Sequence, residues 1–145
     1  MSDASPASAK QLPYPDRDSE RYWAAACEGR LELQRCSRCK TWRWPAREIC
    51  HRCHSFDYTW QATSGRGRIA SWVVTHQPFA AGWQDELPYV VVSVALDDAP
   101  EIKLYGNLLS GEPAEGLPVR ATFPQVAEGV HLVQWEAVPS PPAAD

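Results

Sequence analysis

The chain has 145 residues, 44% of them hydrophobic, which suits one domain with a modest core or a small module joined to a larger one. Its net charge is −4, and no apolar run approaches the roughly 20 residues that span a bilayer, which argues against a membrane protein. The first ten residues do not resemble a signal peptide, so we expect a reducing, cytoplasmic location without membrane contact.

The N-terminal part predicts a flexible arm followed by one short helix. Residues 1–17 contain three prolines and are expected to be irregular. Asp18 and Ser19 are capping residues, residues 21–28 favour a helix, and Gly29 ends it.

This helix has an apolar face that we expect to be exposed. Tyr22, Trp23 and Ala26 form that face, and they are our candidates for contact with a partner protein. Because one short helix cannot stand alone, it must dock on its own chain or on another one. Cys27 follows Trp23 by one turn and is expected to be a small buried apolar residue.

Two C-x-x-C pairs follow, separated by ten residues. Residues 31–35 alternate like a strand and lead into Cys36 and Cys39, and Cys50 and Cys53 form the second pair. Four thiolates at this spacing can converge tetrahedrally on one ion, and zinc is the metal that such a set usually holds. The spacing therefore predicts a zinc ribbon with a closed, structural site, since no position is left for water or substrate.

Three other uses of these cysteines fit the sequence less well. Two disulfides fit poorly with five cysteines in a reducing compartment, and an iron–sulfur cluster or a redox pair is less typical of this spacing. His51 and His54 flank the second pair and could compete as ligands, but we expect them to be exposed or outside the ligand set.

Charge is unevenly distributed along the chain. Residues 30–53 carry a net +5, whereas residues 97–145 carry −6. A zinc ion with four thiolates has a charge of about −2, which nearby basic residues would partly neutralise. The basic residues could instead form a patch for phosphate or an acidic partner; they are Arg30, Arg35, Arg38, Lys40, Arg43, Arg47 and Arg52.

The rest of the chain predicts strands. Residues 64–67 (Ser-Gly-Arg-Gly) break the pattern and indicate a junction between two modules. Five strand-like segments without a βαβ rhythm then favour a small OB-fold barrel; they are residues 68–76, 88–96, 101–109, 119–123 and 130–138. The predicted fold is mainly β and has four parts: a flexible arm (1–17), a helix with a rubredoxin-like zinc ribbon (18–63), an OB-fold barrel (64–138) and a flexible tail (139–145).

This arrangement resembles one family over most of the chain, from about Leu12 to Val138. It is the OB-fold and zinc-ribbon family found beside thiolase-like proteins and acyl-CoA hydratases, called domain of unknown function 35. The matching positions are Leu12-Pro13-Tyr14-Pro15, Tyr22-Trp23, Gly29-Arg30-Leu31, Gln34-Arg35-Cys36, Cys39, Trp44-Pro45, Cys50, Cys53, Ser64-Gly65-Arg66-Gly67, Leu87-Pro88-Tyr89 and Val119. The second pair departs slightly, because His51 and His54 stand where the family often has Pro and Gly.

The resemblance implies a partner enzyme. Members of this family look like accessory subunits of thiolase-superfamily enzymes, which supply the catalytic residues for carbon–carbon chemistry on CoA thioesters. The reactions implied are acyl transfer or retro-aldol cleavage, as in steroid side-chain breakdown. On this basis we expect a hetero-oligomer with two copies of each chain and one structural Zn²⁺ per copy of this chain.

The sequence shows no catalytic motif of its own. No Ser–His–Asp order, carboxylate pair or H-E-x-x-H pattern joins the candidates, so we expect the partner to carry the chemistry. The candidates considered were Cys27, Ser71, His76, Asp85, Glu86 and His131.

Two segments are candidates for binding an acyl-CoA ester. Phe79 and Trp83 offer apolar surface in a glycine-containing loop, which suits an acyl chain or a partner groove but also a loop that caps the barrel. Arg66 and Arg68 alternate with glycines and could meet CoA phosphates, although these glycines could equally serve the junction alone.

Three functions therefore remain open. The favoured one is an accessory subunit of a thiolase-like aldolase or acyltransferase. The second is an acyl-CoA-binding module that works alone or beside a hydratase. Nucleic-acid binding is a distant third, because from Arg68 onward the barrel has only Arg68, Lys103 and Arg120 to track a phosphate backbone.

Overall fold

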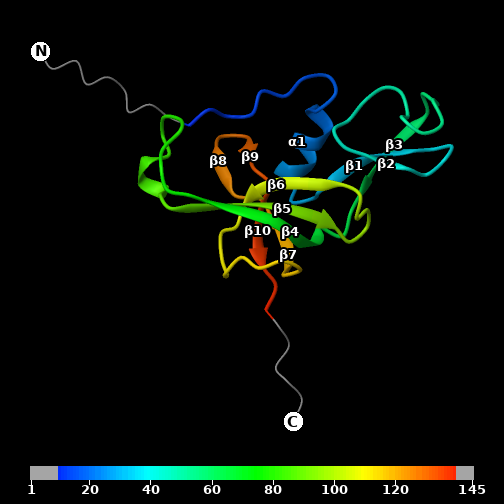
Figure 1. Cartoon of the computed structure of the whole chain (residues 1–145). Helices are drawn as coiled ribbons and strands as arrows, with labels where there is room; N and C mark the ends of the chain where they lie inside the picture. Colours follow the sequence, from blue (N-terminus) through cyan, green and yellow to red (C-terminus); the bar gives the residue numbers. More distant parts are fainter. Residues whose placement is uncertain (1–9, 140–145) are drawn as a thin grey trace, which may run out of the picture.

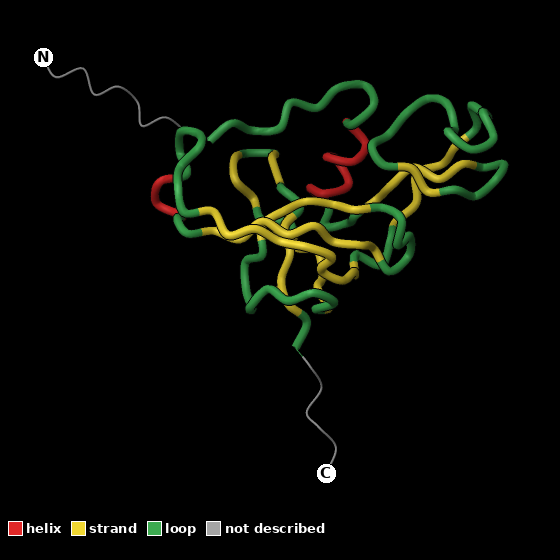
Figure 2. The backbone as a smooth tube through the Cα atoms, in the orientation of Figure 1, coloured by secondary structure: helices red, strands yellow, loops and turns green. Residues whose placement is uncertain are grey.

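The computed structural model describes residues 10–139, and these form one α-helix, a three-stranded sheet, a five-stranded sheet and a two-stranded hairpin (Figure 1). Strands and loops make up nearly all of this part (Figure 2). Residues 1–9 and 140–145 lie outside the described residues, and with them most of the predicted arm and tail. The described part contains no helix that is long and apolar enough to cross a bilayer.

The helix α1 (Glu20–Cys27) begins with a reciprocal pair of hydrogen bonds. The Asp16 carboxylate accepts from the Ser19 amide (2.8 Å) and hydroxyl (2.6 Å), while the Ser19 hydroxyl accepts from the Asp16 amide (3.0 Å). Ser19 thus bonds Asp16 instead of capping the helix with its side chain, as its position had suggested. The predicted end is confirmed: Gly29 has φ +76°, and its N–H donates to the Ala26 carbonyl.

The expected exposure of the apolar helix face is wrong. Tyr22 is 6% exposed and Ala26 is 1% exposed, because α1 packs this side against the core of its own chain. The Tyr22 ring lies against Trp44 at a centroid distance of 4.4 Å, and Trp23 is partly buried beside it. Cys27 is exposed instead of buried, and its thiol donates to the Gly129 carbonyl.

The ribbon is a three-stranded antiparallel sheet in the order β2-β1-β3. Its strands are β1 (Glu32–Cys36), β2 (Trp42–Arg43) and β3 (Tyr58–Ala62). Strand β2 lies between the two cysteine pairs, and β3 follows the second pair.

The five-stranded sheet has the order β10-β7-β4-β5-β6 and closes into a barrel. The Leu109 N–H donates to the Trp135 carbonyl (2.8 Å), and a parallel bridge joins Leu108 to Trp135, so β6 lies beside β10. This confirms the predicted five-stranded OB barrel. Its strands are β4 (Arg66–Thr75), β5 (Tyr89–Leu96), β6 (Lys103–Asn107), β7 (Pro118–Thr122) and β10 (Gln134–Ala137).

One predicted strand proved to be two. Residues 130–138 contain β9 (Val130–His131) and β10, and β9 pairs with β8 (Gln125–Ala127) in a hairpin turned at Gly129 (φ +69°). A short 3₁₀ turn, η1 (Gln84–Glu86), lies in the loop between β4 and β5.

Helix, ribbon and barrel share one hydrophobic core. Leu31 and Leu33 of the ribbon segment pack with Val92 and Val94 of β5, and Trp135 is fully buried among them. In β5 the alternate residues Val92, Val94 and Leu96 are all buried on one face. The two modules are therefore folded together, and the core is common to both.

The second half of β4 is exposed on both faces. A register irregularity lies between Ile69 and Ser71 in β4. Beyond it Trp72, Val73 and Val74 are 40%, 60% and 45% exposed, so neither face of this half is fully covered. In this half β4 pairs with β5 alone among the described strands, because β7 pairs with β4 only from Arg66 to Arg68.

Candidate metal centre and binding surfaces

The two cysteine pairs form equivalent turns. The Lys40 N–H donates to the Cys36 carbonyl and the His54 N–H donates to the Cys50 carbonyl, both at 3.0 Å. Lys40 and His54 also share a left-handed backbone, with φ of 64° and 61°. The departure at His54 therefore leaves the second turn in the same shape as the first, although the left-handed backbone is strained for a residue that has a side chain.

The turns bring four sulfur atoms within 4.8 Å of one another. The Cys36–Cys53 and Cys39–Cys50 sulfurs are 3.5 and 3.6 Å apart, too far for disulfides at about 2.05 Å. Sulfurs bound tetrahedrally to zinc at about 2.3 Å would be about 3.8 Å apart, so the observed separations fit a zinc site. The cluster can therefore hold a metal with all four positions filled by protein.

Local hydrogen bonds favour some of the thiolates. The Thr41 hydroxyl, 3.1 Å from the Cys39 sulfur, lowers the pKa of this thiol to about 6, and the Thr41 amide contributes. Backbone N–H groups, that of Cys39 first, also lower the pKa of Cys36. For Cys53 the Ser55 amide acts in the same direction, but burial and the neighbouring thiols outweigh it and raise the pKa to about 11. The sequence did not suggest a role for Thr41.

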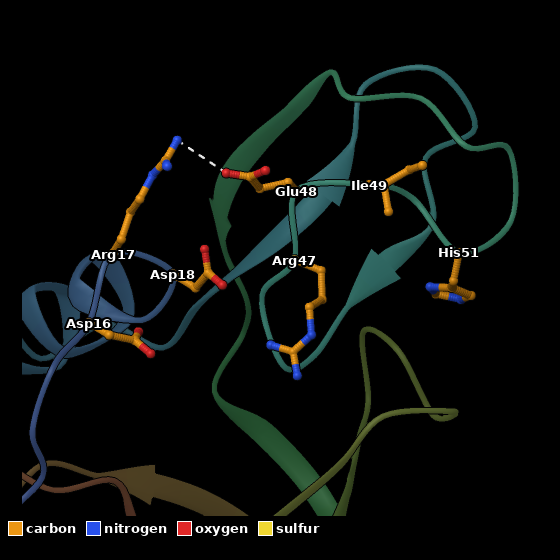
Figure 3. A pocket seen from close by; sticks show the side chains of 7 residues that line it. All are labelled: Asp16, Arg17, Asp18, Arg47, Glu48, Ile49 and His51. Atoms are coloured by element: carbon orange, nitrogen blue, oxygen red, sulfur yellow. Dashed lines mark ion pairs between the residues drawn. The ribbon is translucent and has the colours of Figure 1, made fainter.

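His51 and His54 are both exposed, and the four-sulfur cluster does not include either imidazole. His51 borders an open groove of about 620 Å³ between the start of α1 and the second cysteine turn (Figure 3). Across this groove Arg17 and Glu48 form an exposed ion pair at 3.1 Å. The other lining side chains mix both charges and make no catalytic arrangement among the described residues; they are Asp16, Asp18, Arg47 and Ile49.

The catalytic candidates are spread over the barrel. Cys27 and His131 border one small cavity of about 40 Å³, which is too small for a substrate, and the Cys27 thiol is directed to a carbonyl instead of to His131. Glu86 pairs with Lys10. The structure does not bring Ser71 or His76 to either of these places.

The four candidate CoA contacts do not form one site. Arg66 and Arg68 lie at the start of β4, whereas Phe79 and Trp83 follow its other end. A ten-residue strand is about 30 Å long, so one compact group cannot contact all four. Arg68 also donates to the Gly116 carbonyl at 3.1 Å. Gly67, between the arginines, serves packing: a Cβ there would lie 2.6 Å from Val94 Cγ1.

Trp83 lines the largest cavity described, about 740 Å³. The Lys10 ammonium lies 4.2 Å from the centre of its ring and also pairs with Glu86. This cavity could not be anticipated from local sequence patterns, because its walls come from segments far apart in the chain. The apolar part of the wall is formed by Leu12, Leu109, Pro124, Val126 and Leu132.

A second feature of this end is an uncharged, exposed apolar surface. Residues 69–84 contain no Asp, Glu, Lys or Arg. The surface, which we call the β4 surface, includes Trp72 and Val74 on one face of the strand, Val73 on the other, and the 82% exposed Phe79. Among the described residues, the edge of β4 opposite β5 has no strand partner beyond Ile69. Isolated proteins usually protect such edges with charge, proline or a covering segment.

Comparisons with known proteins agree with this architecture. A family model described as the rubredoxin-like zinc ribbon domain of ChsH2 matches residues 23–59. A second, described as the C-terminal OB-fold domain of ChsH2, matches residues 60–124. The two matches meet inside β3.

Two similar proteins are named as hydratase subunits. The chain is 35% identical over 117 residues to a probable enoyl-CoA hydratase alpha subunit of Thermomonospora curvata. It is 30% identical over 131 residues to the 3-oxo-4,17-pregnadiene-20-carboxyl-CoA hydratase alpha subunit of Mycobacterium tuberculosis. These matches cover 79% and 88% of this chain but 35% and 40% of the relatives, so the chain spans less than half of their length.

A structural match covers nearly the whole of a related chain. A solved structure described as the Ltp2-ChsH2(DUF35) aldolase contains a chain that superposes with a TM-score of 0.77 at 31% identity. The match covers 86% of this chain and 98% of that one. A DUF35 domain-containing scaffold protein of Methanocaldococcus jannaschii is 28% identical, over 65% of this chain and 67% of the relative.

Proposed function

Because the chain belongs to the ChsH2 family of zinc-ribbon and OB-fold proteins, also called domain of unknown function 35, we propose that it is a non-catalytic accessory subunit of a thiolase-superfamily enzyme acting on acyl-CoA thioesters. The reaction class is carbon–carbon chemistry, either retro-aldol cleavage of a side chain or acyl transfer. The solved relative, described as the Ltp2-ChsH2(DUF35) aldolase, supports cleavage as the first choice.

The observation that carries this proposal is the β4 surface. Exposed apolar side chains, an unpaired strand edge and sixteen uncharged residues occur together at one end of the barrel. An uncovered edge of this kind favours association with another chain. We assign the partner enzyme to this surface because the relatives are described as parts of multi-subunit enzymes.

Zinc is proposed as a structural ion. Cys36, Cys39, Cys50 and Cys53 would hold one Zn²⁺ and complete its coordination, which leaves no open position for a substrate. When bound, the ion would stabilise both cysteine turns, of which the first lies between β1 and β2 and the second between β2 and β3. Removal of the metal would destabilise the ribbon, and with it the core that Leu31 and Leu33 share with the barrel.

An acyl-CoA ester would contact this chain at the cavity beside Trp83. The cavity volume of about 740 Å³ and its apolar wall suit an acyl group, and the cavity lies at the same end as the β4 surface. Phe79 is part of the β4 surface and would contact the partner or the acyl group. Arg66 and Arg68 would need a separate phosphate contact, because they lie at the opposite end of β4.

The test is co-purification with a candidate thiolase-like subunit, followed by measurement of complex size, zinc content and turnover of a CoA ester. We expect a stable complex whose turnover needs both chains. Val73→Lys, in the β4 surface, should abolish the complex, whereas Ile49→Lys, the same change at an exposed apolar residue of the ribbon, should not. A complex that survives Val73→Lys would contradict the assignment of the surface.

A hydratase-associated subunit is the second candidate, favoured by the names of two relatives. Co-purification with a hydratase subunit instead of a thiolase-like one would select it. Binding of acyl-CoA by this chain alone, without any complex, would select a free-standing binding module. Nucleic-acid binding stays third, for the shortage of basic residues in the barrel.

A further inference from the structure

Arg43 is a buried arginine with no hydrogen-bond partner. Its residue is 3% exposed, and all three guanidinium nitrogens are buried without a partner among the described residues. The other six basic residues of the segment 30–53 are exposed or half-buried. An arginine side chain remains charged in a protein, and a buried charge is costly unless an opposite charge compensates it.

The strand register shows where the side chain runs. Arg43 of β2 is paired with Gln34 of β1, and Cys36 lies two residues further along β1, on the same face. Tyr58 of β3 is paired with Cys36. The Arg43 guanidinium carbon lies 5.0 Å from the centre of the Tyr58 ring, two strands away from its own backbone. The side chain therefore crosses the central strand beside Cys36.

The opposite charge is expected from the cysteine cluster. With zinc bound, four thiolates leave a net charge of about −2, and one of them belongs to Cys36. Carboxylates are not paired with Arg43 among the described ion pairs. Basic residues at the surface neutralise such a centre weakly, because water and salt screen them.

We propose that Arg43 is the buried counter-charge of the metal centre and favours metal binding through space. This inference rests on the proposed occupancy of the four cysteines by zinc. No hydrogen bond joins the guanidinium to a sulfur among the described residues, so Arg43 is a positioning and neutralising residue and is not a ligand. The stack on Tyr58 holds the charge at this place.

Arg35 of β1 provides a matched control, because its side chain lies on the opposite face of the sheet from Gln34 and Cys36. Its guanidinium stacks on Trp42 at 4.9 Å, but Arg35 is half-buried and donates to the Lys40 carbonyl at 2.8 Å. The experiment compares Arg43→Met, Arg43→Lys and Arg35→Met in the full chain. Each protein is loaded with Co²⁺, and metal affinity is measured by chelator competition, with the sulfur-to-cobalt charge-transfer band as the signal.

Arg43→Met should bind metal about 10–100-fold more weakly and shift the charge-transfer band, as expected for loss of an outer-sphere partner. Arg43→Lys should retain most of the affinity, and Arg35→Met should change it by less than about threefold. Equal losses of affinity in Arg43→Met and Arg43→Lys would mean that the shape of the guanidinium group, and not its positive charge, supports metal binding. This result would overturn the inference. An unchanged affinity in Arg43→Met would do the same.

Failure of the zinc proposal is a separate result, because the wild-type chain would then bind neither Zn²⁺ nor Co²⁺. If Arg43→Met does not fold even with excess metal, the test compares Arg43→Lys with the wild type. Alkylation of the metal-bound cysteines should be slow and similar in both. A Lys variant that folds but is alkylated at the rate of the metal-free protein would overturn the charge argument.

Discussion

Gly67→Ala tests the packing between β4 and β5. A Cβ at this position would lie 2.6 Å from Val94 Cγ1 and closer still to the Ala95 carbonyl oxygen. Ordinary contacts are roughly 3.5–4.0 Å, so β4 would have to move by about 1 Å from β5. The carbonyl is part of a paired strand and cannot rotate away. Over-packing of this kind costs about 1–3 kcal/mol, and the backbone contact places Gly67→Ala at the upper end.

The assay is thermal unfolding of the zinc-loaded protein, followed by Trp fluorescence. A loss of about 3 kcal/mol should lower the Tm by about 6–12 °C for a chain of this size. Gly116→Ala is the control, because a Cβ there meets open space and only its φ of +78° opposes the change. That strain costs about 1–2 kcal/mol. Equal Tm values for the two variants would refute the argument that close approach, and not backbone conformation, requires Gly67.

Three further predictions concern the metal, the core and the β4 surface. Cys36→Ser or Cys53→Ser should remove zinc and much of the folded structure, measured by metal analysis and circular dichroism; a metal-free variant that stays fully folded would contradict structural zinc. Leu33→Ala, at a position with 0% exposure, should cost about 2–5 kcal/mol and leave one unfolding transition, because ribbon and barrel share their core; separate transitions would show independent modules. The chain expressed alone should associate, and Val73→Lys should reduce that association in light scattering; a wild type that is cleanly monomeric at all concentrations would count against an obligate subunit.

Local features of this protein could be predicted from its sequence. The cysteine spacing was sufficient for the ribbon, because a C-x-x-C turn depends on four adjacent residues and on the geometry of one ion. The helix end at Gly29 and the alternating valines of β5 follow from backbone preference and side-chain period in the same way. The OB barrel could be proposed because five strands without crossover helices leave few other closed arrangements.

Relations between distant segments were decided by the tertiary structure alone. Tyr22 and Ala26 are buried because α1 packs on ribbon and barrel residues that the local sequence does not indicate. Arg66 and Trp83 are both candidate CoA contacts, but a ten-residue extended strand places them far apart. Arg43 looks like six other basic residues until the sheet register buries it beside Cys36. Sequence patterns report local conformation, whereas burial and the formation of a site depend on which strands become neighbours.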